Sequence, residues 1–174
     1  LKIDGTATFD FDLNWLPDPS VHKPNVLHIG TLVTIVEPGA SVLYVVAQII
    51  GGILGVWVVH AMFGEPILQV STSASDGAHL ALAEGIANFG LLLTIFGGLK
   101  ARPEAVPALV GLYITAAYWF TASTSFANPA VTIARTLTDS AAGIAPHSAP
   151  AWIAGQLIAT AIAAVLLPRL FNEE

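Results

Sequence analysis

The apolar residues of this chain are gathered into four long stretches, which are separated by shorter and more polar segments. The stretches run approximately over residues 40–63, 80–99, 105–122 and 150–168. A helix needs about 20 consecutive apolar residues to cross the hydrocarbon core of a bilayer. Glu84 is the one Asp, Glu, Lys or Arg within all four stretches. The pattern therefore predicts an all-α membrane protein with four spanning helices.

The composition agrees with this prediction and narrows the possible functions. Of the 174 residues, 55% are hydrophobic and 10% are charged, and the mean hydropathy is +0.73. Soluble domains carry about 25% charged residues. The net charge of -6 argues against nucleic-acid binding, which requires a basic surface. The sequence shows no Cys, no metal-ligand cluster, no nucleophile–base pair and no phosphate loop, so we expect no metal, no cofactor and no enzymatic activity.

The basic residues predict how the chain is oriented in the inner (plasma) membrane. Cytoplasmic loops are enriched in Lys and Arg. Lys100 and Arg102 lie between the second and third stretches, and Arg169 follows the fourth. These residues place the C-terminus in the cytoplasm and the segments 64–79 and 123–149 outside, with Arg135 as the exception. His60 and His79 lie near the ends of spans and are expected at the interface.

A weak internal repeat relates two of the stretches. Residues 44–51 (YVVAQIIG) match residues 152–159 (WIAGQLIA), with Gln48 and Gln156 in register. The predicted topology starts the two copies on opposite sides of the membrane, as in the inverted repeats of transport proteins. We expect both Gln side chains to form hydrogen bonds between helices.

Small residues recur at helical spacing in the same two stretches. Gly51 and Gly55 form one such pair, and Gly155, Ala159 and Ala163 form a longer series. Small side chains allow helices to approach closely in lipid. We therefore expect both sets to pack against other helices.

The segment Asn128-Pro129-Ala130 predicts a short helix between the third and fourth spans. Asn is a favoured N-cap and Pro is favoured at the first helical position, so the helix should run from Asn128 to about Leu137. It is too short to cross a bilayer, and its apolar residues suit burial among other helices. A helix that enters the membrane and stops presents free N–H groups and the positive end of its dipole.

With this motif between two spans, residues 44–167 resemble the aquaporin (major intrinsic protein) family from its third to its sixth transmembrane helix. Within this region, residues 114–146 are most similar to bacterial aquaporins associated with arsenic-resistance genes. The resemblance implies an aquaporin-like helical bundle that forms a homotetramer in the lipid bilayer. Family members enclose each pore with six helices and two half-helices. This chain supplies four helices and one half-helix, so the bundle is incomplete.

The resemblance also implies roles for individual residues. Asn128, Pro129 and Ala130 match the second pore motif of the family. Val131 stands where the family's selectivity filter usually has Arg, and Arg135, one turn further, is expected to be structural. The filter positions contributed by the fifth helix and by the loop carbonyl fall near Ala116 and Ser125. A wide and uncharged constriction of this kind suits small neutral solutes such as glycerol, undissociated arsenous acid and water.

Glu84 matches an acid that the family buries in its fourth helix, where it accepts hydrogen bonds from the loop before the half-helix. An acid at membrane depth is a functional candidate by default. The alternative is an acid in the first helical turn that extends to the lipid headgroups. Asn88 lies four residues on, on the same helical face.

Residues 1–39 do not resemble the family and form a separate, polar N-terminal segment, whereas residues 40–174 form the aquaporin-like transmembrane region. Residues 6–15 alternate in polarity as a strand does, and a Pro-rich turn follows. Asp18-Pro19-Ser20 is a faint echo of the second motif, but no spanning stretch precedes it. The first half of the pore is therefore absent or replaced, and the sequence is expected to be truncated.

Two further interpretations remain open at this stage. The chain could be a non-conducting remnant that lacks the first half of the pore. It could also be a coupled transporter with broken helices, which would need ionisable residues along its path, and Glu84 is the single candidate.

Overall fold

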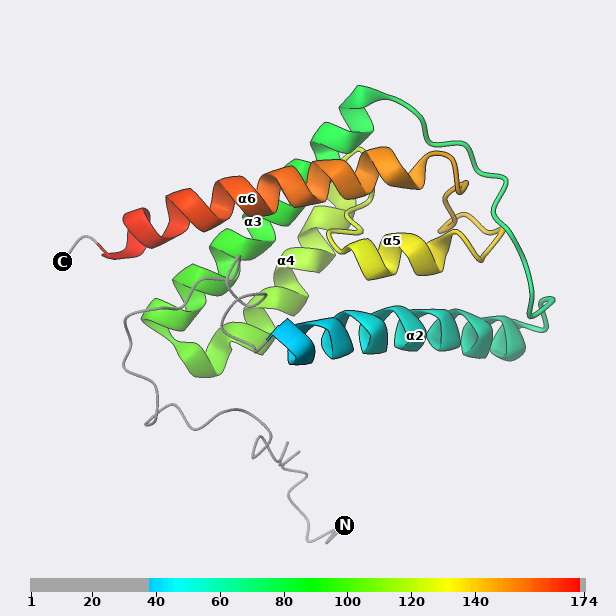
Figure 1. The fold of residues 1–174 in the computed structure, drawn as a ribbon, viewed down its shortest axis with the longest axis horizontal. Coiled ribbons are helices and arrows are strands. Elements are labelled where there is room, and N and C mark those ends of the chain that lie inside the picture. Colours follow the sequence, from blue (N-terminus) through cyan, green and yellow to red (C-terminus); the bar gives the residue numbers. More distant parts are fainter. Residues whose placement is uncertain (1–37, 173–174) are drawn as a thin grey trace, which may run out of the picture.

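The computed structural model describes residues 38–172, and these form five α-helices and one turn of 3-10 helix (Figure 1). The helices are α2 (Pro38–Phe63), α3 (Ala78–Ala101), α4 (Val106–Phe120), α5 (Pro129–Arg135) and α6 (Ala149–Asn172), and the 3-10 turn η1 (Pro103–Ala105) precedes α4. No strand occurs within this described range. The strand-like residues 6–15 and the Asp18-Pro19-Ser20 echo lie outside it.

Three of the helices are long and apolar enough to cross a membrane, whereas the sequence predicts four. The three candidate spans are Val42–Phe63, Ala78–Ala101 and Ala149–Phe171. Helix α4 has 15 residues, which corresponds to about 22 Å at 1.5 Å per residue, against a hydrocarbon core of about 30 Å. It ends two residues before the apolar stretch does because Thr121 is extended and its hydroxyl donates to the carbonyl of Ala117.

The centre of the fold is the pair formed by α3 and α6. The two helices approach each other closely at Gly155. A Cβ atom at this position would overlap the carbonyl oxygen of Ala81, so only glycine allows the contact. Further along the pair, a cluster of large and small apolar side chains is almost completely buried. Its members are Leu92, Phe96, Ala163 and Leu167. The expected packing role of the small residues on α6 is therefore confirmed.

The ends of α3 and α6 lie together, and this brings two of the basic segments to one side. The Nζ of Lys100 donates to the carbonyl oxygen of Phe171 at 2.7 Å, and the Phe171 ring stacks on Phe96. Figure 1 shows the same end of the bundle holding the α3–α4 connection and the C-terminal end of α6. Lys100, Arg102 and Arg169 therefore share one side, as the charge pattern predicts.

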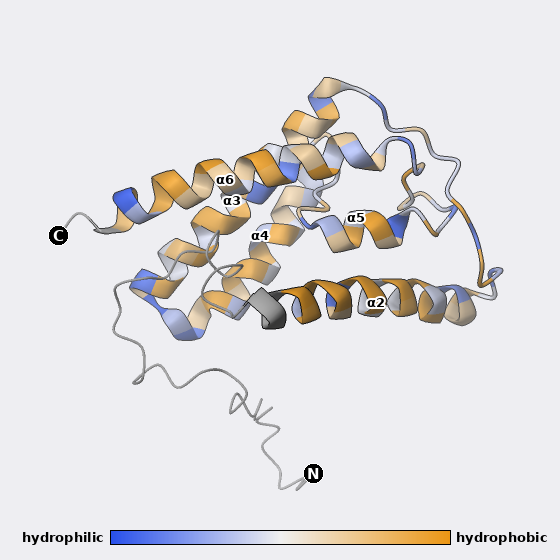
Figure 2. Cartoon of the chain, viewed as in Figure 1, coloured by the Kyte–Doolittle hydropathy of each residue, from blue (hydrophilic) through white to orange (hydrophobic). Residues whose placement is uncertain are grey.

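Helix α2 forms the edge of the bundle and, among the described helices, contacts α5 only (Figure 1). Gly52 makes this contact, since a Cβ atom there would lie 3.1 Å from the Cβ of Ala134. The expected packing of Gly51 and Gly55 is not found within the described chain, where neither has an atom within 4 Å of its Cβ position. Figure 2 shows that α2 is hydrophobic along most of its length. Its apolar side chains are left exposed.

Candidate functional site

The short helix α5 begins where the sequence predicts. Asn128 is the N-cap in extended conformation, and its Oδ1 accepts a hydrogen bond from the Ala130 N–H at 2.8 Å. Pro129 occupies the first helical position, where a missing N–H costs nothing. Because Oδ1 is used by the cap, the Nδ2 group of Asn128 is left as the donor for any other partner.

The loop that leads into α5 is held by a single buried carboxylate. Oε1 of Glu84 accepts from the Phe126 N–H at 2.9 Å, and Oε2 accepts from the Ala127 N–H at 2.8 Å. The Nε2 of Gln156 also donates to Oε2, at 2.5 Å. Glu84 is 0% exposed, so the alternative of an acid that extends to the headgroups does not agree with its position. Both carboxylate oxygens therefore accept hydrogen bonds, from three donors in all.

The same loop has an unusual backbone. Thr124, Ser125 and Ala127 all have positive φ angles of 50–59°, although none of them is glycine. Such conformations cost on the order of 1–3 kcal/mol each and persist only when surrounding contacts fix them. The two backbone N–H groups that Glu84 binds belong to this stretch and provide that constraint. The carboxylate of α3 therefore determines the course of the chain into α5.

Polar side chains connect the start of α5 to α6. The Nε2 of Gln156 donates to the Thr132 Oγ1 at 3.0 Å, and that hydroxyl donates to the Asn128 carbonyl oxygen at 3.0 Å. Gln156 thus forms hydrogen bonds between helices as expected, whereas its repeat partner Gln48 is exposed on α2. Asn88 links α3 to the same residue of α6, because its Nδ2 donates to the carbonyl of Gln156 at 2.8 Å.

With this arrangement of a buried acid, a bent loop and a capped short helix described, the chain can be compared with known proteins. The chain is 49% identical over 124 residues to the aquaglyceroporin AqpS of Rhizobium meliloti strain 1021, a match that covers 71% of this chain. The chain is therefore similar, over the matched residues, to a member of the aquaporin family. The chain spans about half the length of that relative, since the match covers 53% of it.

Two other comparisons found nothing. No family model matches the chain, and no solved structure matches it. The assignment of the aquaporin-like region therefore stands on the curated relative and on the geometry of the described residues.

The aquaporin-like region places the three expected filter positions in different surroundings. Val131 is half-buried and packs against a cluster of Phe126, Ile144 and Trp152. Ser125 is buried at 7% exposure, and its Oγ has no hydrogen-bond partner within the described chain. Ala116 lies on the exposed side of α4, while the next residue, Ala117, is fully buried.

Arg135 covers one face of the same apolar cluster. Its guanidinium carbon lies 4.2 Å from the centre of the Phe126 ring, and that ring also contacts Trp152, at 4.7 Å between centroids. The Nη1 of Arg135 donates to the carbonyl of Ala142 at 3.4 Å. The sequence shows that Arg135 lies one helical turn beyond Val131. It does not show that the Arg135 side chain contacts the loops on either side of α5.

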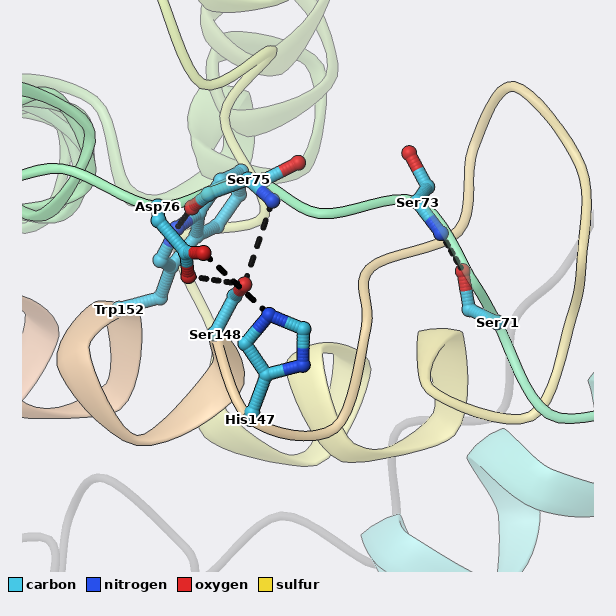
Figure 3. A network of polar contacts seen from close by, with 7 residues as sticks. All are labelled: Ser71, Ser73, Ser75, Asp76, His147, Ser148 and Trp152. Atoms are coloured by element: carbon cyan, nitrogen blue, oxygen red, sulfur yellow. Dashed lines mark hydrogen bonds and ion pairs between the residues drawn. The ribbon is translucent and has the colours of Figure 1, made fainter.

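A polar network fixes the α2–α3 connection above α6, and sequence reasoning missed it (Figure 3). Asp76 accepts from the Ser148 hydroxyl at 2.5 Å and faces the Nε2 of His147 at 3.3 Å. Ser148 in turn accepts from the Ser75 N–H, and Trp152 donates to the Ser75 carbonyl at 3.0 Å. The hydrogen bond from Ser148, followed by the charge of His147, lowers the pKa of Asp76 below its ordinary value.

His60, which is expected near the membrane interface, is buried within the protein. It is 3% exposed, its Nδ1 lies 3.0 Å from the carbonyl oxygen of Ile67, and its Nε2 lies 2.9 Å from the Thr138 Oγ1. The connection after α2 folds back over the last turn and covers the ring. Only the tertiary structure brings Thr138, 78 residues later, to this position.

Proposed function

We propose that this chain provides half of a passive membrane channel for small neutral solutes, in the inner membrane with its C-terminus in the cytoplasm. The observation that carries the proposal is the capped half-helix α5, whose lead-in loop is held by the buried carboxylate of Glu84. The N-terminal end of a helix is electropositive and repels cations. The Nδ2 of Asn128 supplies a hydrogen-bond donor to a passing hydroxyl or water.

The residues around this half-helix favour solutes larger than water. Val131, which is half-buried and uncharged, stands where the family usually has Arg, and Ala116 adds only a methyl group. A constriction without a guanidinium is wider and less selective for water. We therefore assign glycerol and undissociated arsenous acid as solutes, together with water. The matched relative is named an aquaglyceroporin, which agrees with this assignment.

The third filter position, Ser125, has a buried polar group without a partner in the described chain. A buried hydroxyl without a partner costs about 1–3 kcal/mol. The Ser125 Oγ is such a group within the described chain, and it lies on the loop just before the N-cap Asn128.

The outer surface of the described helices suits lipid and further copies of the chain. Large apolar side chains are exposed along α2, α4 and α6. Examples that are more than half exposed are Leu43, Val58, Met62, Leu112, Trp119, Leu157 and Ile158. Such a surface would be unfavourable in water. We propose lipid contact and, by family resemblance, a homotetramer.

The test uses a chimaera in which this aquaporin-like region replaces the matched part of the relative, so that the remaining half of the pore is present. Replacement of Val131 by Arg should reduce glycerol and arsenous acid flux at least several-fold more than water flux, because a guanidinium narrows the route and favours small hydrogen-bonding solutes. Stopped-flow light scattering of proteoliposomes measures all three fluxes.

The matched control is Val131→Leu, which adds a methylene group without charge. It should change all three fluxes by a similar factor. Equal loss of every solute in Val131→Arg, or no loss at all, would show that Val131 does not line the route.

A further inference from the structure

Val131 and Arg135 lie on one face of α5. Residues four apart are neighbours on a helix and differ by about 6 Å along its axis. The other faces are occupied: Ala130 and Ala134 face Gly52 of α2, and Thr132 faces Gln156 of α6. The Val131–Arg135 face lies against the loop before α5, with Val131 on the cluster that includes Phe126 and Arg135 over the Phe126 ring.

The guanidinium of Arg135 is held in place on this face. It stacks over the Phe126 ring at 4.2 Å from the ring centre, and Nη1 reaches the Ala142 carbonyl at 3.4 Å. The ring is itself fixed, because Phe126 is 7% exposed and packs against Trp152. Its backbone N–H is bonded to Glu84. The cation is thus attached to the same loop that Glu84 positions.

Within the described residues, Arg135 forms no ion pair, and the Glu84 carboxylate acts on it only at longer range. Within the described residues, the single side-chain ion pair is His147 with Asp76, and no carboxylate there lies within 4.0 Å of the Arg135 nitrogens. A guanidinium carries five N–H donors, and one of them has a protein acceptor here. The remaining donors have no acceptor within the described residues, and the opposite charge that acts on the guanidinium is that of the Glu84 carboxylate.

We propose that Arg135 is a specificity-determining residue that excludes cations from the route beside Val131 and favours solutes with oxygen acceptors. This inference rests on the proposed route past Val131. The filter position itself has no charge, so without Arg135 the exclusion of cations depends on the dipole of the half-helix alone. A fixed charge about 6 Å further out, partly shielded from water, adds to that exclusion without narrowing the route.

The chain has no Cys, so one introduced thiol reports on this potential in the full chain. Val131→Cys is reacted, in phosphatidylcholine nanodiscs, with two methanethiosulfonates of similar size, one bearing a sulfonate and one a trimethylammonium group. Leu68→Cys, at a side chain that is 78% exposed, gives the reference ratio of the two rates. Each thiol variant is prepared with Arg135, with Arg135→Gln and with Arg135→Lys.

We expect the anionic reagent to be favoured at the Val131→Cys thiol by roughly tenfold over the reference ratio, and 0.5 M salt should reduce this preference. Arg135→Gln should return the ratio to the reference value, whereas Arg135→Lys should retain most of the preference because it keeps the charge. If Arg135 only supported the loop, the Gln and Lys variants would change the ratio alike. Arg135→Lys also keeps the test decisive if the Gln variant does not fold.

The inference is overturned if the ratio at the Val131→Cys thiol is the same with Arg135 and with Gln. It is also overturned, together with the filter placement, if this thiol reacts with neither reagent while the Leu68→Cys thiol reacts with both. The two experiments can also disagree. If the Val131→Cys thiol keeps its charge preference but the chimaera passes no neutral solute, the effect of the Arg135 charge is supported and only the proposed function is contradicted.

Discussion

At the residue scale, Glu84 has the largest structural consequences. It is the one charged residue within the long apolar stretches, and it binds two backbone N–H groups and one side-chain amide in a fully buried position. A buried charge is tolerated only where hydrogen bonds replace its hydration. Here the partners include the loop before α5, so the desolvated acid and the strained loop stabilise each other.

Replacement of Glu84 by Gln should therefore destabilise the fold. An amide offers one acceptor oxygen where the carboxylate offers two, and its NH₂ group would oppose the N–H of Ala127 or the amide of Gln156. Each buried donor left unpaired costs about 1–3 kcal/mol. The expected result is a lower thermal midpoint in detergent, measured by tryptophan fluorescence.

The matched control is Glu104→Gln, which makes the same chemical change at an exposed residue of η1. It should leave the midpoint unchanged. If both variants unfolded at the same temperature, Glu84 would not hold the loop.

At the element scale, the fold depends on how closely α3 and α6 approach and on how the connections are fixed at the ends. Gly155 sets the approach, and the Phe96 and Phe171 rings close the far end of the pair. At the other end, Ser148 and Asp76 join the start of α6 to the connection that precedes α3. Both devices keep α6 in the position from which its glutamine reaches the buried acid and the short helix.

A Val side chain at position 155 should separate α3 from α6. Its Cβ would overlap the backbone oxygen of Ala81, which cannot move without displacing α3. Overpacking of this kind costs about 1–3 kcal/mol. Gly51→Val is the matched control, because no atom of the described chain lies within 4 Å of that Cβ position. The thermal midpoint should fall for Gly155→Val only, and an equal fall in both would contradict close packing at Gly155.

The attachment of the α2–α3 connection should weaken in acid. The pKa of Asp76 is lowered from 3.8 mainly by the Ser148 hydroxyl and further by His147. A depressed folded-state pKa means that the ionised form stabilises the attachment above about 3.8 and that this contribution is lost as the pH falls through the folded value. The hydrogen-exchange protection factors of residues 64–77, which correct for the pH dependence of intrinsic amide exchange, should therefore fall at low pH.

In Asp76→Asn these protection factors should already be lower at pH 7 and should not fall further in acid. Asp139→Asn changes a second outer carboxylate, whose pKa is lowered by hydrogen bonds from Thr72, and serves as a comparison. An acid-dependent fall in protection that persists in Asp76→Asn but disappears in Asp139→Asn would contradict the prediction and assign the effect to Asp139 and Thr72 instead.

At the scale of the whole molecule, the described helices form only one side of an enclosure. Helix α2 contacts α5 alone among them, and none of its spanning window is buried. The half-helix has no counterpart within the described residues, so half of a central dipole barrier is lacking there. Backbone groups at membrane depth require protein or water as partners and cost several kcal/mol when they lack them.

The 174-residue chain by itself should therefore conduct poorly. Purified chain in liposomes is compared with the full-length relative at equal protein density, and glycerol flux is measured by stopped-flow swelling. We expect a per-chain permeability at least tenfold lower than that of the relative. Comparable permeability would mean that an oligomer, or residues outside the described range, completes the enclosure.

The sequence by itself determined the long helices and the start of the short one. Span length and hydropathy predict α2, α3 and α6 to within a few residues, and Asn128-Pro129 predicts the N-cap because capping is a local interaction. The family resemblance also pointed to Glu84. These features depend on neighbours along the chain or on a motif with fixed spacing.

Only the tertiary structure decided which polar side chains meet. Gln156 is buried against Glu84 while its repeat partner Gln48 is exposed, although the two have the same local pattern. The ring of His60 is covered by a distant loop, and the guanidinium of Arg135 stacks on an aromatic ring outside α5. Local sequence fixes the face of a helix on which a residue lies, but the partner on that face comes from another helix or loop, whose position depends on packing of the whole chain.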